Sequence, residues 1–371
     1  MTSTHESVDR DRRRARAPRG TIGLIGLAMA VALLCTFTVP RFASVVNVQS
    51  MAFQVAEIGL LSLVIAISMY TAGIDLSLVS VANLSALVTA QLFVVTGAAT
   101  ADPGTSVLLT VLCAGAGMAT GAVCGAINGL IITKLRVSPI LATLGTMQLF
   151  NGLAIAWTSG ESVYGMPDAF LMLGTQYLLG VPLPFVVLAV VAVLAAVLMG
   201  SRPLGFRIYV LGSNSEASRF AGVPNARVLL ATYVLCGMIS AVAGLVIAAR
   251  SASASPDYGA SYLLLAIVIA VLGGTNPNGG SGTLLGVVIA AITLQMVSSG
   301  FNLLGLSQFT YQVVQGLILI AVMGIGLLMK SWDPNKVFSP KQKRPAPEAG
   351  SDDKTEQQTP NGDNKKEKAH V

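Results

Sequence analysis

The sequence predicts an all-α polytopic membrane protein, with about ten transmembrane helices and both termini in the cytoplasm. Of its 371 residues, 53% are hydrophobic and 11% are charged, whereas soluble domains are about 25% charged. The mean hydropathy is +0.72. A helix that crosses a bilayer needs about 20 mostly apolar residues, and ten apolar segments follow one another along this chain. We therefore expect a multi-pass membrane protein rather than a soluble domain.

The ten segments set the expected order of the helices. They are Thr21–Val39, Met51–Thr71, Leu76–Val95, Thr105–Thr133, Pro139–Ser159, Pro182–Met199, Val228–Ala249, Tyr262–Leu272, Thr283–Leu303 and Phe309–Met329. The first is longer than the roughly 7–15-residue core of a signal peptide and no small-residue cleavage site follows it, so we interpret it as a spanning helix. The eighth is shorter than a span, so it either borrows flanking residues or is a broken helix buried in protein.

Basic residues predict the side of the membrane on which each loop lies. Residues 1–20 hold six arginines against three acidic residues, and a basic end beside an apolar run favours the cytoplasm. When the segments alternate from that side, the turn at 134–138 and the loop at 201–227 also fall in the cytoplasm. Arg41 and Arg250 fall outside and are the exceptions to the positive-inside rule.

The same pattern divides the chain into three parts. We expect a basic cytoplasmic tail over residues 1–20, a transmembrane domain over 21–330 and a second cytoplasmic tail over 331–371. This last part holds eight Lys or Arg and seven Asp or Glu and is too polar to bury a core, so we expect it to be disordered. Its nearly balanced charge favours a solvated tail, with attraction to anionic membrane lipid as the alternative.

Few residues suggest chemistry on this chain. Apolar runs contain the four cysteines, Cys35, Cys113, Cys124 and Cys236, without the spacing of metal ligands or of a disulfide framework. The sequence contains no Gly-Lys-Ser/Thr motif of a phosphate-binding loop. We therefore predict no catalytic residue, no metal and no cofactor bound by this chain.

Glycines at a four-residue spacing predict close helix packing. One helix stripe of the fourth segment carries Gly117, Gly121, Gly125 and Gly129, and their missing side chains let a neighbouring backbone approach. The neighbouring helix belongs either to the same chain, which general packing favours, or to a second copy.

The junction between the second and third segments carries an acidic residue beside a glycine. Asp75, flanked by Gly73 and Ser77, would accept orphan amide hydrogen bonds at a helix start, so we expect a helix cap. A gate or an ion site is the alternative, less favoured because no second carboxylate lies nearby in the sequence. Glu57 must face the bundle interior because an unpaired charge in lipid is costly, and its role stays open.

A glycine-rich turn joins the eighth and ninth segments and contains Gly273, Gly274, Gly279 and Gly280. It has no lysine that could reach a phosphate, which argues against a nucleotide site. We interpret it as a tight re-entrant turn beside a polar route through the bundle.

Polar side chains within the apolar segments are candidates to line such a route. They are Asn83, Thr143, Thr146, Gln148, Asn151 and Asn302. Amides and hydroxyls bind a neutral polyhydroxylated solute without burying a charge, but they also tie helices together, which is the commoner use of any one of them.

The polar loop at 201–227 is the expected docking surface for an energy-supplying partner. A short helix follows Asn214, with Glu216 in its first turn and Arg219 towards its end, as the helix dipole prefers. A helix of this length needs a surface to lie on, and Phe220 and Arg219 are typical interface anchors. A solvated connector is the alternative. The expected coupling residues are Gly212, Asn214, Glu216, Ala217, Arg219, Phe220 and Gly222.

Several motifs together resemble one protein family. They are Gly73–Ser77, Asn128–Leu130, Lys134–Pro139, Thr143–Met147, Gly212–Val223, Gly273–Thr275 and Gly279–Thr283. In this order, over about residues 50–330, the chain resembles the permease subunits of bacterial ribose/xylose/rhamnose-type sugar ABC importers. Leu263 and Leu265 stand where acidic residues often occur in that family, so the chain looks more like the rhamnose or autoinducer-2 branch.

The resemblance implies a permease that passes a neutral sugar, either a pentose, a deoxyhexose or a related compound, across a bacterial inner membrane. It implies a cytoplasmic ABC ATPase that holds ATP and Mg, a second permease copy or paralogue, an extracytoplasmic sugar-binding protein and surrounding membrane lipid, but no nucleic acid. The Gly212–Val223 segment would engage the ATPase. An ion-coupled secondary transporter is the alternative, disfavoured because paired intramembrane carboxylates are not evident, and a membrane scaffold without transport is a third reading.

Overall fold

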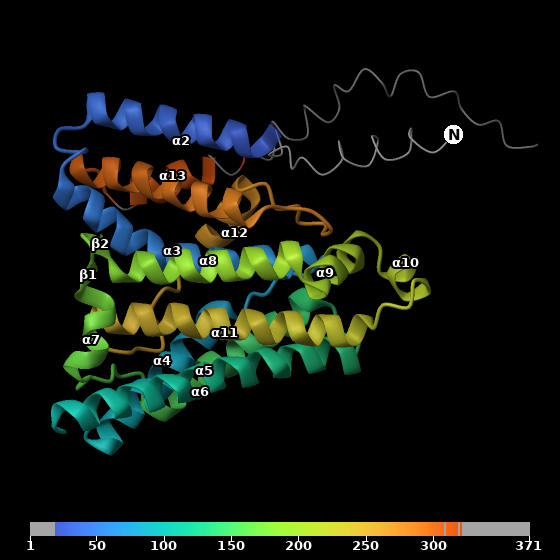
Figure 1. Ribbon diagram of the computed structural model, residues 1–371, viewed down its shortest axis with the longest axis horizontal. Coiled ribbons are helices and arrows are strands. Elements are labelled where there is room, and N and C mark those ends of the chain that lie inside the picture. The colour runs from blue at the N-terminus through green and yellow to red at the C-terminus, as the bar shows by residue number, and fades with distance from the viewer. Residues whose placement is uncertain (1–18, 308, 318–319, 321–371) are drawn as a thin grey trace, which may run out of the picture. The chain divides into compact units, whose positions relative to one another are not determined.

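The computed structural model describes residues 19–307, 309–317 and 320 (Figure 1). The tail expected over 331–371 lies outside these residues, as do nearly all of the tail expected over 1–20 and the end of the tenth apolar segment. Within the described residues the elements are helices apart from one hairpin, whose two strands have two residues each. The predicted all-α membrane fold is therefore confirmed.

Eight helices in the described part of the chain are long and apolar enough to cross a membrane. They are α2 (Arg19–Thr38), α3 (Val45–Tyr70), α4 (Leu78–Thr96), α5 (Pro103–Lys134), α6 (Pro139–Thr158), α8 (Leu183–Ser201), α11 (Asn225–Ser251) and α13 (Leu284–Leu303). Each coincides with one of the predicted segments. Hydrophobic runs of this length form helices in lipid because a helix satisfies every backbone hydrogen bond within itself.

Four shorter helices and the hairpin connect these spans. They are α7 (Asp168–Thr175), α9 (Pro203–Ser213), α10 (Ser215–Phe220), α12 (Tyr262–Leu272), β1 (Tyr177–Leu178) and β2 (Val181–Pro182). Tyr177 pairs with Pro182 and Leu178 with Val181 in the antiparallel hairpin. Figure 1 places α7 and the hairpin at one end of the bundle and α9 with α10 at the other.

Helix α3 lies at the centre of the bundle. It is buried without interruption over residues 55–70 and contacts α11, α13, α12 and α8. A helix that is hydrophobic all round is either buried in protein or faces lipid, and α3 is buried in protein. Helix α2 shows the opposite pattern, since its side chains are mostly exposed and it contacts α13 on one side only. Its exposed face suits lipid.

The glycine stripe of α5 faces two helices of the same chain. Gly117 meets Ser85 and Thr89 of α4, and the other three glycines meet α11, which lies alongside α5 (Figure 1). A Cβ atom added at Gly125 would lie 2.9 Å from the carbonyl carbon of Tyr233, and one at Gly129 would lie 2.9 Å from Cα of Leu230. Real Cβ atoms do not approach backbone atoms that closely. The absence of side chains at these positions therefore allows α5 and α11 to touch through their backbones.

The eighth predicted span is a broken passage. Helix α12 begins only at Tyr262, and residues 252–261 before it are not helical. The Asn83 side chain donates hydrogen bonds to the carbonyl oxygens of Pro256 and Tyr258, at 2.6 Å and 2.9 Å. Irregular backbone at membrane depth needs partners of this kind inside the protein. The sequence left open whether this span borrows flanking residues or is a broken helix, and the structure shows a broken helix.

Candidate functional site

The exposed end of the bundle at α9 and α10 has a locally fixed structure. Oδ1 of Asn214 accepts hydrogen bonds from the amides of Glu216 and Ala217, at 3.0 Å and 2.9 Å. Asn225, at the start of α11, donates to the carbonyl of Ser215 at 2.9 Å and accepts from the Ser218 hydroxyl at 2.8 Å. A six-residue helix is not stable alone, so these bonds hold α10 in place against α11.

The surface of α9 and α10 carries aromatic and charged side chains that no other part of the described chain covers. Phe220 is 91% exposed and Phe206 is 69% exposed, while Glu216 and Arg219 are also exposed. A shallow cavity of about 270 Å³ is lined by Phe206, Tyr209, Val210, Ser213, Asn214 and Ala217. Exposed aromatic rings beside an arginine are typical of the residues that dominate interface energetics. The predicted coupling residues from Asn214 to Gly222 are therefore gathered on one accessible surface, whereas Gly212 is buried beneath it. Their role remains a prediction.

The glycine-rich turn packs directly on the loop at 201–227, which is the coupling segment. The amide of Gly280 donates to the carbonyl of Tyr70 at 3.1 Å, and the hydroxyl of Tyr209 donates to the carbonyl of Gly282 at 3.4 Å. Burial raises the pKa of the Tyr209 hydroxyl. A Cβ atom at Gly279 would lie 2.6 Å from the carbonyl oxygen of Gly212.

Positive φ angles explain why this turn needs glycine. Gly274, Gly279 and Gly280 have φ of +85°, +89° and +74°, a region that side chains with a Cβ rarely occupy. Gly212 is buried between the Tyr70 carbonyl and the turn, where a side chain would overlap backbone atoms. The coupling segment, the end of α3 and the turn are thus one packed unit, an arrangement that the sequence did not predict.

A second group of predicted residues forms a buried hydrogen-bond network. Oδ1 of Asp75 accepts from the amide of Ser77 at 2.9 Å and from its hydroxyl at 2.7 Å. Asn128 donates to the Ser77 hydroxyl oxygen at 2.7 Å and accepts from the Thr146 hydroxyl at 2.6 Å. The Thr143 hydroxyl accepts the amide of Leu76 at 3.1 Å.

This network joins the α3–α4 connection to α5 and α6. Asp75, Ser77, Asn128 and Thr143 are no more than 2% exposed, and Gly73 is closed in by Pro139 and Tyr233. Asp75 binds the amide directly before α4, whereas Ser77 makes no side-chain cap. Whether Asp75 also acts as a gate stays a prediction.

The six candidate route residues do not gather around one cavity. Thr143 and Thr146 belong to the buried network and Asn83 holds the segment at 252–261. On α6, Gln148 is exposed and Asn151 is half-buried, and Asn302 is exposed on α13. The structure therefore does not bring this set together as a single lining, and its use as a route remains a prediction.

Sequence reasoning missed one charged cluster, formed by Glu57, Arg250 and Tyr262. Nη1 of Arg250 lies 2.7 Å from Oε1 of Glu57, and the Tyr262 hydroxyl donates to Oε2 of Glu57 at 3.3 Å. Glu57 was expected to face the interior and Arg250 broke the positive-inside rule. Two unmatched charges of opposite sign within apolar segments are themselves a signal for such a pair.

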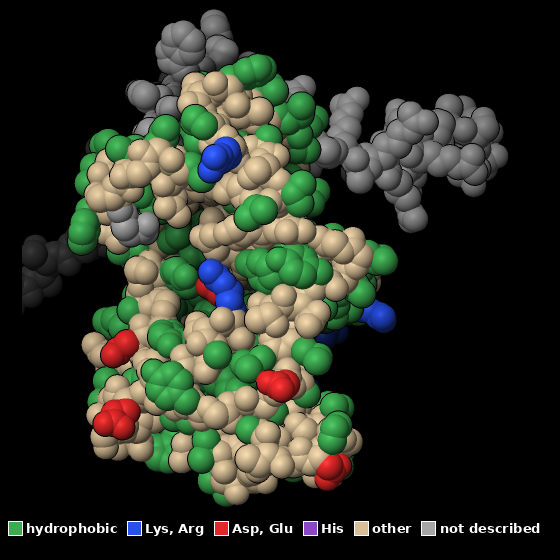
Figure 2. Space-filling view, turned by 90° about the vertical axis from the view of Figure 1, so that its left-hand side faces the viewer, with side chains coloured by type: hydrophobic (Ala, Val, Ile, Leu, Met, Phe, Trp, Pro, Cys, Tyr) green, Lys and Arg blue, Asp and Glu red, His purple; other side chains and the backbone are tan. Residues whose placement is uncertain are grey.

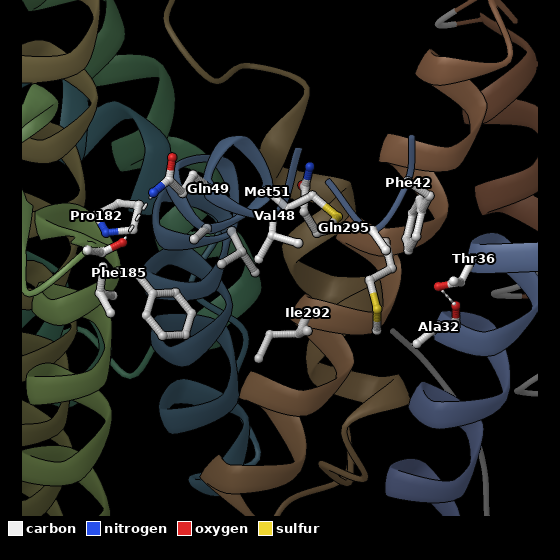
Figure 3. Close-up of a pocket in the computed structure, with 16 residues that line it drawn as sticks. Ala32, Thr36, Phe42, Val48, Gln49, Met51, Pro182, Phe185, Ile292 and Gln295 are labelled. Carbon is white, nitrogen blue, oxygen red and sulfur yellow. Dashed lines mark hydrogen bonds between the residues drawn. The ribbon is translucent and has the colours of Figure 1, made fainter. Parts of the chain in front are cut away.

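The largest of the described cavities, about 500 Å³, lies between α2, α3, α8, α13 and β2 (Figure 3). Its lining is mostly apolar, with Phe42, Val48, Phe185 and Ile292 among the side chains drawn. Gln295 at its edge donates to the Gln54 side chain at 3.1 Å. Such a lining offers few groups to the hydroxyls of a sugar and fits an apolar chain better.

Comparisons with known proteins assign the chain to a family. The family described as branched-chain amino acid transport system / permease component matches residues 47–323. The ribose import permease protein RbsC of Bacillus subtilis (strain 168) is 37% identical over 305 residues, covering 81% of this chain and 90% of that protein.

Two further relatives carry other substrate names. The autoinducer 2 import system permease protein LsrD of Yersinia enterocolitica is 32% identical over 80% of this chain and 91% of its own length. The L-arabinose transport system permease protein AraH of Escherichia coli (strain K12) is 31% identical over 81% of this chain and 88% of its own length. No solved structure matches the chain.

Proposed function

Because the chain belongs to the branched-chain amino acid transport system / permease component family, we propose that it is the membrane-spanning permease subunit of an ABC importer for a neutral sugar. Its relatives are named for the import of ribose, L-arabinose and autoinducer 2. It is a multi-pass protein of the inner membrane. The sugar would enter from an extracytoplasmic binding protein and leave into the cytoplasm.

The observation that carries this proposal is the exposed coupling segment. It is held rigidly by Asn214 and Asn225 yet leaves Phe220 uncovered, which suits a surface that docks a partner. The partner of our proposal is a cytoplasmic ATPase that binds ATP and Mg, while a second permease copy or paralogue completes the route. Within this scheme the chain itself performs no chemistry and moves the sugar by changing conformation.

The distribution of charge supports an orientation in which α9 and α10 face the cytoplasm. The end that carries α9, α10 and the α5–α6 turn holds Lys134, Arg136, Arg202, Arg207, Arg219 and Arg227. Acidic residues are spread over the opposite end, the face shown in Figure 2. Since basic loops stay in the cytoplasm, the coupling segment would face the ATPase there.

A pull-down experiment with one variant tests the docking surface. The chain is tagged, expressed in its native host and purified in mild detergent, and the ATP hydrolysis that co-purifies is measured. Phe220→Ala should reduce that activity by about tenfold or more, because removing a central aromatic anchor from an interface costs about 2 kcal/mol. Leu179→Ala is the matched control, since Leu179 is 98% exposed in the β1–β2 hairpin at the opposite end.

Equal ATP hydrolysis with both variants would remove α10 from the proposed interface. No associated hydrolysis with the unaltered chain, together with uptake that depends on an ion gradient, would instead favour the ion-coupled transporter.

A further inference from the structure

The ion pair of Glu57 and Arg250 lies where three separate elements meet. Glu57 comes from the middle of α3, Arg250 from the last turn of α11 and Tyr262 from the start of α12. In the part of the chain that the structure describes, this is the one salt bridge between side chains. It is also reinforced by the Tyr262 hydroxyl, which donates to the second carboxylate oxygen at 3.3 Å.

The pair borders a cavity of about 270 Å³ that Tyr258, Gly259, Ser251 and Ile247 also line. The side chain of Arg250 is 35% exposed whereas that of Glu57 is 5% exposed, so the guanidinium faces the opening and the carboxylate lies deeper. Figure 2 shows a hollow in this face of the bundle, with a basic group lying against an acidic one. The cluster is thus reachable from the outer end.

The segment at 252–261, which contributes Tyr258 and Gly259 to the cavity lining, is held in a defined position. Asn83 binds the carbonyl oxygens of Pro256 and Tyr258, at 2.6 Å and 2.9 Å, and the hydroxyl groups of Ser253 and Tyr258 lie 2.6 Å apart. The non-helical segment at 252–261 is therefore fixed to α4. A binding site gains affinity when its groups are placed before the ligand arrives.

Stability alone does not account for the charges. Replacing a buried ion pair with well-packed apolar side chains is often neutral or stabilising, because desolvation offsets the attraction. Ionisable groups inside membrane segments are therefore functional candidates. This pair carries no net charge, so it gives little attraction to a simple ion.

Its chemistry matches adjacent hydroxyl groups of a neutral solute. The carboxylate accepts hydrogen bonds, and the guanidinium carries N–H donors beyond the Nη1 group that contacts Glu57. One hydroxyl of a vicinal pair would donate to Glu57 while its neighbour accepts from Arg250. The rings of Tyr258 and Tyr262 add flat apolar surfaces beside the polar groups, which suits the C–H face of a sugar ring.

We propose that Glu57, Arg250 and Tyr262 form a contact site for the hydroxyl groups of a neutral sugar, on the outer side of the route. This inference rests on the proposed function and names where in the chain the sugar is held. The sugar enters the site as a transported solute and no covalent step occurs.

A double substitution separates binding from structural support. Glu57→Leu combined with Arg250→Leu removes both charges and keeps the site filled, so folding is expected to survive. The complete transporter, with its ATPase and binding protein, is reconstituted in proteoliposomes and given labelled D-ribose, D-xylose and L-arabinose. Uptake should fall by about tenfold or more for each sugar that the unaltered transporter takes up, since hydrogen bonds to charged groups are lost. Glu161→Leu, which removes an exposed carboxylate, is the control.

Tyr262→Phe provides the second readout because it removes one hydroxyl and leaves the ion pair in place. A site that touches sugar predicts a changed ratio of uptake among the three sugars, whereas a structural tie would slow all three equally. Unchanged ratios, together with uptake by the double variant equal to that of Glu161→Leu, would overturn the proposal. Should the double variant fail to fold, the Tyr262→Phe ratios decide alone.

The proposed function has its own separate point of failure. If the unaltered transporter takes up none of the three sugars in an ATP-dependent manner, the assignment as a sugar importer fails and the contact site falls with it. ATP-dependent uptake by the unaltered protein, combined with insensitivity of both variants, contradicts the contact site alone.

Discussion

Single polar side chains specify how this apolar bundle packs. Apolar packing between helices in lipid is permissive, since lipid tails are as apolar as leucine. The Asn128 side chain bridges Ser77 and Thr146 through bonds of 2.7 Å and 2.6 Å, and a shift of α5 along either neighbour would break these bonds. The network therefore fixes α5 and α6 against the start of α4.

Replacing Asn128 with leucine should destabilise the chain by about 1–3 kcal/mol, because buried hydroxyls at Ser77 and Thr146 lose a partner. Thermal unfolding of the purified protein in detergent measures the loss as a lower midpoint. Asn302→Leu is the matched control, since Asn302 is exposed at the end of α13. Equal midpoints for the two variants would contradict the role given to the network.

For single residues, the sequence indicates which polar side chains matter better than it predicts the residues with which they form hydrogen bonds. Asp75 and Ser77 stand out beside a helix start, and Thr143 and Thr146 stand out as polar residues in an apolar run. Their mutual bonds depend on how α4, α5 and α6 pack, which no local pattern specifies. The pair of Glu57 and Arg250 was missed for the same reason, because 193 residues separate its members.

Helices and turns are predicted from the sequence more accurately than side-chain partners, because the length of an apolar run and the spacing of glycines are local properties. The eight described spans match predicted segments since each run is long enough to cross a bilayer. The structure of the non-helical segment before α12 was not predicted, because a short apolar run does not determine the conformation of the residues that precede it. Its structure is set by the distant Asn83 side chain.

The glycine stripe gives a prediction with an internal control on the same helix. Gly125→Leu should cost about 1–3 kcal/mol or block assembly, because the new side chain overlaps the backbone of α11 at Tyr233. Gly115→Leu should be tolerated, since a Cβ atom there meets nothing within 4 Å. Expression level and the unfolding midpoint in detergent compare the two. Equal behaviour of both variants would show that the stripe is not a close contact.

For the bundle as a whole, the packed elements form a continuous connection between its two ends. The coupling segment contacts the glycine-rich turn through Tyr209 and Gly212. That turn follows α12, whose first residue, Tyr262, donates a hydrogen bond to Glu57. A helix of 11 residues spans about 16 Å, so α12 connects the turn with the cavity beside Glu57. The family assignment covers this whole unit, since it matches residues 47–323.

The most direct test of the central proposal is the energy source for uptake. The chain is reconstituted with its ATPase and binding protein, and uptake of labelled D-ribose, D-xylose and L-arabinose is measured with ATP held constant, with and without an ionophore that removes proton and sodium gradients. An ABC permease predicts uptake of at least one sugar that requires ATP and the binding protein and is unchanged by the ionophore. Uptake that persists without ATP, or that the ionophore abolishes, would contradict it.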